Sequence, residues 1–70
     1  MNMTVAKAIS NGWRIQSAER FPSGTFERVA HHPRFGDAIG FGRSLWAVRL
    51  SLLQNIEIKE SMHRILGEPA

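Results

Sequence analysis

Arginine offers the clearest chemistry in this sequence, because seven of the nine basic side chains are Arg. A guanidinium is planar, stays charged, and binds a carboxylate or a phosphate through two parallel hydrogen bonds. Residues 1–49 carry seven basic against three acidic side chains, whereas residues 50–70 carry two against three. The first part of the chain therefore favours an acidic surface or a nucleic acid as partner, although dispersed charges are also typical of any solvated surface.

A glycine-rich run, Gly40-Phe41-Gly42-Arg43-Ser44, precedes a predicted helix. Backbone N–H groups, an Arg and the positive end of a helix dipole can together hold an anion. The run matches neither of the glycine-rich nucleotide-binding motifs. The commoner interpretation is a tight turn in which at least one of Gly40 and Gly42 adopts a positive φ, followed by Ser44 as the helix N-cap.

The same run resembles part of a known pattern. A Gly-rich strand end, a Ser, and a helix with a small residue three or four positions on resemble HicB-type antitoxin domains and, more distantly, double-stranded-RNA-binding domains. The resemblance covers about half of the chain and implies a helix packed on a three-stranded antiparallel sheet. The RNA-binding family carries lysines at this helix start, whereas here Leu45 and Trp46 follow Ser44, and only Arg49 stands where a later lysine would be. What the resemblance implies is fold more than function.

Residues for catalysis or metal binding are sparse. The chain has no Cys and no Tyr, and its imidazoles are His31, His32 and His63. Adjacent residues on a strand point to opposite faces, so His31 and His32 cannot chelate one metal from a regular strand. No nucleophile motif is present. We therefore expect no enzymatic activity, no cofactor and no metal.

Six aromatic side chains are interleaved with the arginines. Such rings can stack on bases, but in a small domain their commoner use is to fill the core, with one or two left for a partner surface. The residues that we expect to contact a partner are five arginines and one tryptophan: Arg14, Arg28, Arg34, Arg43, Trp46 and Arg49.

The elements that must position these residues follow from local signals. Thr4 can cap a short helix over residues 5–9, which Asn11 and Gly12 would end. Alternating residues then predict a strand over 13–20, a turn at 21–24 with Pro22 and Gly24, and a second strand over 25–31. A loop over 34–37 and a short third strand over 38–41 complete the sheet, and we place Arg14 and Arg28 on its solvent face.

Ser44 is a good N-cap for a helix from residue 45 towards Leu66, with Gly67 as its stop. The apolar face of this stretch changes side near Ile56, so either the helix breaks around residues 54–55 or its second half packs on something else. Alternation over residues 46–58 also fits a hairpin, which remains an alternative. On the helix, Arg49 falls on the apolar face, where it should reach a carboxylate or a carbonyl or be covered by another chain.

Seventy residues predict one domain over residues 1–70, of the α+β class. A core of this size supplies only roughly 3–5 kcal/mol, and no disulfide can help, so we expect a homodimer through the C-terminal helix. The lack of Cys, of an apolar span and of a signal peptide predicts a cytoplasmic protein.

The sequence-based hypothesis for function is a small non-enzymatic protein that binds a protein or protein complex, as a stoichiometric inhibitor or regulator of the phage or mobile-element type. The alternative is a nucleic-acid-binding module that uses the Arg-rich sheet and the glycine-rich loop.

Overall fold

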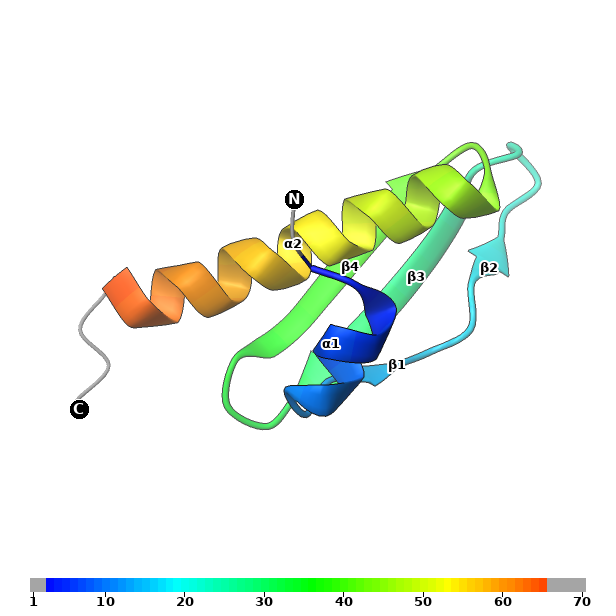
Figure 1. Ribbon diagram of the computed structural model, residues 1–70. Helices are drawn as coiled ribbons and strands as arrows, with labels where there is room; N and C mark the ends of the chain where they lie inside the picture. Colours follow the sequence, from blue (N-terminus) through cyan, green and yellow to red (C-terminus); the bar gives the residue numbers. More distant parts are fainter. Residues whose placement is uncertain (1–2, 66–70) are drawn as a thin grey trace.

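The computed structural model describes residues 3–65 and confirms the α+β class: a short N-terminal helix, a four-stranded antiparallel sheet, and a long C-terminal helix packed against the sheet (Figure 1). The elements in chain order are α1 (Val5–Ser10), β1 (Arg14–Ile15), β2 (Glu19–Arg20), β3 (Phe26–His32), β4 (Gly36–Gly42) and α2 (Leu45–Ile65). Within these residues, no helix is long and apolar enough to cross a membrane.

Helix α1 has the predicted ends. The Thr4 hydroxyl accepts a hydrogen bond from the Lys7 N–H at 3.0 Å, so Thr4 is the N-cap. The Asn11 N–H bonds back to the Lys7 carbonyl at 2.9 Å, and Gly12 follows with a φ of +102°. A residue with a Cβ rarely adopts that φ, which explains why glycine stands here.

Strand β3 is the centre of the sheet. β4 pairs with one of its edges, and both β1 and β2 pair with the other edge, one after the other. The turn between β2 and β3 is as predicted, with Gly24 at a φ of +88° and a Phe21 N–H to Thr25 carbonyl bond of 2.8 Å. The predicted loop over 34–37 is shorter, since β4 already begins at Gly36, whose φ is +85°.

The strand predicted over residues 13–20 is instead two short strands. The Gln16 N–H still bonds to the Val29 carbonyl at 2.9 Å, but the chain then leaves β3 until Glu19. The Arg28 side chain takes the place of the missing ladder bond, because its Nε donates to the Gln16 carbonyl at 2.7 Å. This interruption leaves part of β3 without a neighbouring strand.

Helix α2 is continuous, so neither the break nor the hairpin alternative applies. Ser44 caps it as predicted, its Oγ accepting from the Ala47 N–H at 3.0 Å. The first half lies on the sheet, whereas the second half projects beyond it (Figure 1). The residues buried on α2 all belong to the first part: Val48, Leu52, Leu53 and Ile56. The predicted stop at Gly67 lies outside the described residues.

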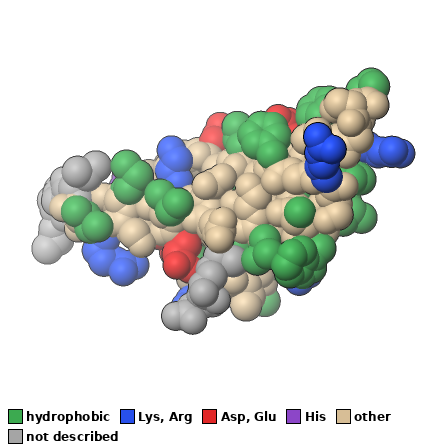
Figure 2. Space-filling model, turned by 90° about the horizontal axis from the view of Figure 1, so that it is seen from above, with side chains coloured by type: hydrophobic (Ala, Val, Ile, Leu, Met, Phe, Trp, Pro, Cys, Tyr) green, Lys and Arg blue, Asp and Glu red, His purple; other side chains and the backbone are tan. Residues whose placement is uncertain are grey.

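Beyond Ile56, the apolar side chains of α2 lie on a different side and are exposed: Ile58, Met62 and Ile65. Viewed from above, hydrophobic side chains lie along α2 between its charged residues (Figure 2). The change of face therefore marks the point where the helix leaves the sheet. Self-association through these side chains stays a prediction.

Glu60 holds the projecting half of α2 to the rest of the domain. Its carboxylate accepts a hydrogen bond from the Trp13 Nε1 at 2.8 Å and another from the Asn11 Nδ2 at 3.1 Å. One turn further on, the His63 ring meets the Phe35 ring edge-on, with centroids 5.0 Å apart. The second half of α2 thus packs on residues that flank α1 and the β3–β4 turn.

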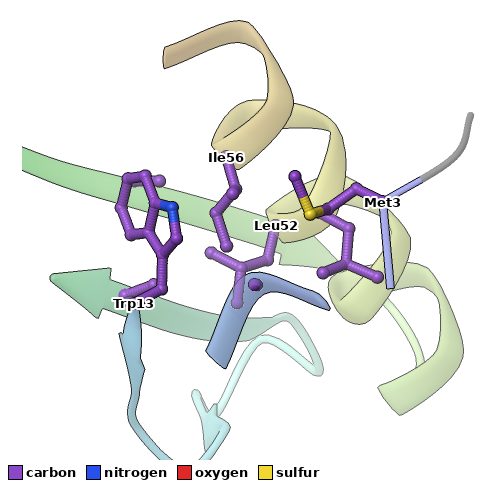
Figure 3. Close-up of a cluster of buried hydrophobic side chains, with 8 residues drawn as sticks. Met3, Trp13, Leu52 and Ile56 are labelled. Carbon is purple, nitrogen blue, oxygen red and sulfur yellow. The ribbon is translucent and has the colours of Figure 1, made fainter. Parts of the chain in front are cut away.

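The core lies between α2, α1 and the sheet, with Trp13, Leu52, Ile56 and Met3 pointing towards one another (Figure 3). On the sheet, the buried positions facing α2 are small, such as the cross-strand pair Ala30 and Ala38. Small residues on one side allow the large side chains of the other side to fill the space at close packing.

Gly40 and Gly42 bring the backbone of α2 directly onto β4. A Cβ at Gly40 would lie 2.5 Å from the Leu52 nitrogen, and one at Gly42 would lie 2.6 Å from the Val48 nitrogen. The prediction that one of these glycines needs a positive φ is wrong, since the positive-φ glycines among residues 3–65 are Gly12, Gly24 and Gly36. Glycine is required at 40 and 42 because no side chain fits there.

We expect Gly42→Val to lower the melting temperature strongly. The new side chain would push α2 away from β4, and overpacking of this kind costs about 1–3 kcal/mol. Arg43→Ala is the control, because Arg43 is exposed in the next position. Thermal melts followed by circular dichroism compare the two, and a Gly42→Val melt equal to that of the parent would disprove the close-contact explanation.

We expect Glu60→Ala to destabilise the protein by about 1–3 kcal/mol, because the partly buried Trp13 N–H loses its charged acceptor. Glu57→Ala removes the same charge one turn earlier on α2 and is the matched control, since the Glu57 carboxylate makes no hydrogen bond within the described residues. Urea unfolding monitored by Trp fluorescence measures the difference, and equal midpoints for both variants would contradict it.

Candidate partner-binding groove

A groove of about 490 Å³ lies between the first half of α2 and the β1–β2 connection. It forms because residues 17–18 leave the sheet, and Figure 1 shows this connection running well away from α2. No strand therefore fills the space beside the start of the helix on the side away from β4. The lining residues come from the connection, from β3 and from α2: Ser17, Ala18, Arg28, Leu45, Trp46, Val48 and Arg49.

Trp46 and Arg49 stand between this groove and a second hollow. The second hollow, of about 290 Å³, shares both residues and is closed on its other side by Met3, Val5 and Leu53. Residues three apart on a helix are neighbours on its surface, so Trp46 and Arg49 form one ridge with a depression on each side. The Trp46 side chain is 67% exposed, and Leu45 beside it is 62% exposed. A large exposed indole next to an Arg is the combination that protein interfaces use as an energetic centre.

Arg28 enters the groove from the sheet. It pairs with Gly40 across β3 and β4, and the side chains of such a pair lie on the same face, here the face covered by α2. The prediction that Arg28 lies on the solvent face is therefore wrong. The bond from its Nε to the Gln16 carbonyl fixes the guanidinium, whose terminal nitrogens donate to no partner within residues 3–65.

Arg49 also differs from the expectation. Of the three alternatives predicted for it on the apolar face, a carboxylate, a carbonyl or cover by another chain, the first two do not apply, because its side chain is exposed and makes neither contact within the described residues. Cover by another chain stays a prediction. The helical position was correct, since Arg49 does lie on the sheet side of α2. The interruption of the strand after Gln16 removed the surface that would have covered it, and no sequence pattern signalled that interruption.

The groove has a positive charge, and no carboxylate lines it among residues 3–65. Arg28 and Arg49 both line it, while the nearest acidic residues of the sheet, Glu19 and Glu27, form a cross-strand pair on the opposite face. Charges that share a small, partly enclosed volume interact more strongly than on an open surface. The groove is therefore suited to a group of negative charge.

The other predicted arginines lie elsewhere. Arg14 pairs with His31 on the open face of the sheet, where both line a separate hollow of about 400 Å³. Arg34 lies in the β3–β4 turn, at the end of the sheet away from the start of α2. Arg43 is exposed immediately before α2. The structure thus brings Arg28, Trp46 and Arg49 together and separates Arg14 and Arg34 from them.

The glycine-rich run that could have held an anion has structural roles. Gly40 and Gly42 pair with β3 inside β4, and the Ser44 hydroxyl caps α2. The residues of the groove that sequence reasoning missed are Ser17, Ala18, Leu45 and Val48. Ser17 and Ala18 were expected inside a regular strand, and Leu45 and Val48 were assigned to the apolar face of the helix.

The histidines form two local arrangements outside the groove. The His31 Nδ1 lies 2.6 Å from the Asp37 Oδ1, and its Nε2 lies 2.9 Å from the Gln16 Nε2. His32 packs between Trp13 and Phe35, with its Nε2 2.8 Å from the Asn11 carbonyl. Within residues 3–65, no group of three His, Asp or Glu side chains could hold a metal ion.

No protein-family model matches this chain, and neither a curated protein nor a solved structure is significantly similar to it. The resemblance to HicB-type antitoxin domains accordingly stays a prediction.

We expect Trp46→Ala and Arg49→Ala to leave stability within about 0.5 kcal/mol of the parent, because both side chains are exposed. Trp13→Ala, which removes the buried indole, is the contrasting variant and should cost about 3–5 kcal/mol. Differential scanning calorimetry of the three variants checks this. A large loss of stability in Trp46→Ala would mean that the ridge serves the fold and not a partner.

Proposed function

We propose that the protein is a small non-enzymatic binding protein that recognises a protein or protein complex through this groove and acts stoichiometrically, as an inhibitor or regulator. The observation that carries the proposal is the ridge of Trp46 and Arg49, exposed between two hollows at the start of α2. Burial of an indole and a neighbouring Arg by a partner is a large source of binding free energy in protein complexes.

The chemistry of the lining supports binding and not catalysis. The guanidiniums of Arg28 and Arg49 stay protonated, so neither can accept a proton as a general base. Among the described lining residues, Ser17 supplies the one side-chain hydroxyl, and none is a histidine or a carboxylate. The side chains of the groove can therefore hold a partner group but have no proton acceptor to activate it.

The distribution of charge favours a protein over a nucleic acid. A phosphate backbone is bound by several cations in a row along one surface. Here Arg28 and Arg49 lie on the α2 side of the sheet, whereas Arg14 lies on the other side, with Glu19 and Glu27 on that same face. The arginines that the sequence offered as a nucleic-acid surface do not form one track.

We expect the immobilised protein to retain a partner from a lysate in a defined ratio, unaffected by nuclease, and Trp46→Ala and Arg49→Ala to lose it. Removing an interface centre of this kind typically costs at least about 2 kcal/mol, which weakens binding roughly thirtyfold. Quantitative mass spectrometry of the retained proteins measures the ratio.

The matched control is Phe41→Ala, which removes an aromatic side chain of similar exposure, 53%, from β4. It should retain the partner as the parent does. Two outcomes would contradict the proposal: capture that disappears with nuclease, which favours nucleic-acid binding, or equal capture by the parent and by Trp46→Ala.

A further inference from the structure

We infer that the groove takes an acidic protein segment, with a carboxylate held between Arg28 and Arg49 and an apolar side chain placed against Trp46 and Leu45. This inference rests on the proposed function and names the partner chemistry of the same site. Four properties of the groove support it: a guanidinium fixed in place, a second one that lines the same groove, no acidic side chain among the described lining residues, and apolar side chains on α2.

The Arg28 guanidinium is already oriented for an incoming anion. Its Nε donates to the Gln16 carbonyl at 2.7 Å, which restrains the long side chain against β1. The two terminal nitrogens donate to nothing within the described residues, so they remain available as a planar fork. A carboxylate matches such a fork with two parallel hydrogen bonds, and little side-chain freedom is lost on binding because Arg28 is already held.

Arg49 contributes the second charge from the helix side. It lines the same groove as Arg28, and it has neither an ion pair nor a hydrogen bond within the described residues. Two like charges that line one groove repel each other, whereas an anion placed between them would attract both. An acidic group is therefore the occupant that this pair favours most.

The α2 wall of the groove carries apolar side chains besides Arg49. Leu45 and Trp46 are both more than half exposed, and the buried Val48 lies beneath them. A purely anionic ligand would leave this wall in water, whereas a segment that carries an aliphatic or aromatic side chain next to its acid would cover it. A volume of about 490 Å³ is in the range of pockets that hold a few side chains. Acidic residues next to a bulky apolar one are thus the expected sequence of the partner segment.

The test is a selection of random short peptides, displayed on particles, against the parent and four variants: Trp46→Ala, Arg49→Gln, Arg28→Gln and Arg14→Gln. We expect the parent and Arg14→Gln to enrich peptides in which Asp or Glu adjoins Leu, Phe or Trp. Arg49→Gln should lose the preference for acids, and Trp46→Ala should lose the preference for the apolar residue.

One enriched peptide, synthesised and titrated by Trp fluorescence, should bind Arg49→Gln about tenfold or more weakly than it binds the parent, as expected for a lost charged hydrogen bond.

Arg14→Gln is the matched control, because it removes the same charge from the open face of the sheet. Arg28→Gln also frees the Gln16 carbonyl, so circular dichroism of that variant accompanies its selection. Arg49→Gln removes no contact within the described fold and keeps the test decisive if Arg28→Gln unfolds.

The outcomes separate the two levels of the proposal. Enrichment of neutral or basic peptides whose binding requires Trp46 would contradict the inference that the partner is acidic. It would still support the proposal that a partner binds in the groove. If the parent and Trp46→Ala enriched the same peptides equally, or if no peptide were enriched, the inference of an acidic segment would be wrong. Either result would also remove support for the groove as a partner-binding site. Binding of a labelled RNA or DNA oligonucleotide that Arg49→Gln abolishes would overturn the inference in favour of a nucleic acid.

Discussion

The direct contact between the backbones of α2 and β4 is the constraint on which this structure depends. Gly40 and Gly42 have no side chain to hold the helix away, and a Cβ at either position would overlap the backbone of α2. Close approach lets Val48 and Leu52 reach the sheet, where the facing residues are small. It also lets polar side chains of α2 reach the free edge of β4: the Ser51 hydroxyl accepts from the Phe41 N–H at 3.1 Å, and the Asn55 amide donates to the Ile39 carbonyl. An edge strand whose polar groups are occupied in this way is a poor template for pairing with another chain.

The same contact explains where the groove lies. Because α2 packs mainly against β4 and much less against β3, it is displaced towards one side of the sheet. The opposite side is thin, since β1 and β2 have two residues each and the chain leaves the sheet between them. The start of α2 therefore faces open space where a third full-length strand would otherwise lie. Arg28 and Arg49 face that space, which is why both can be charged without a carboxylate partner among the described residues.

Local signals in the sequence predicted most of the elements, and long-range packing decided what they could not. Thr4, Gly24 and Ser44 act on neighbouring residues, so their roles as cap, turn and cap were predictable and are confirmed. The role of Gly42 depends on how α2 packs back onto β4, which no local residue pattern records. The glycine-rich run therefore indicated a tight turn, whereas in the structure these glycines form the surface that α2 contacts. Of the groove residues, Arg28, Trp46 and Arg49 were predicted to contact a partner. That they line one groove was not predictable, because the groove results from the interruption of the strand after Gln16.

Among residues 3–65, two further groups of exposed apolar side chains lie outside the groove, besides the single Ile9, and neither group has the groove's combination of shape and charge. Ile39 and Phe41 lie on the open face of β4, where Glu27 is the cross-strand partner of Phe41. Ile58, Met62 and Ile65 lie along the part of α2 that projects beyond the sheet. A convex row of side chains can pack against many partners, whereas a hollow with a fixed donor on the sheet side and an indole and a second Arg on the helix side restricts both the shape and the charge of what enters. We therefore expect the groove to determine which partner binds, and the two other surfaces to add buried area to that complex.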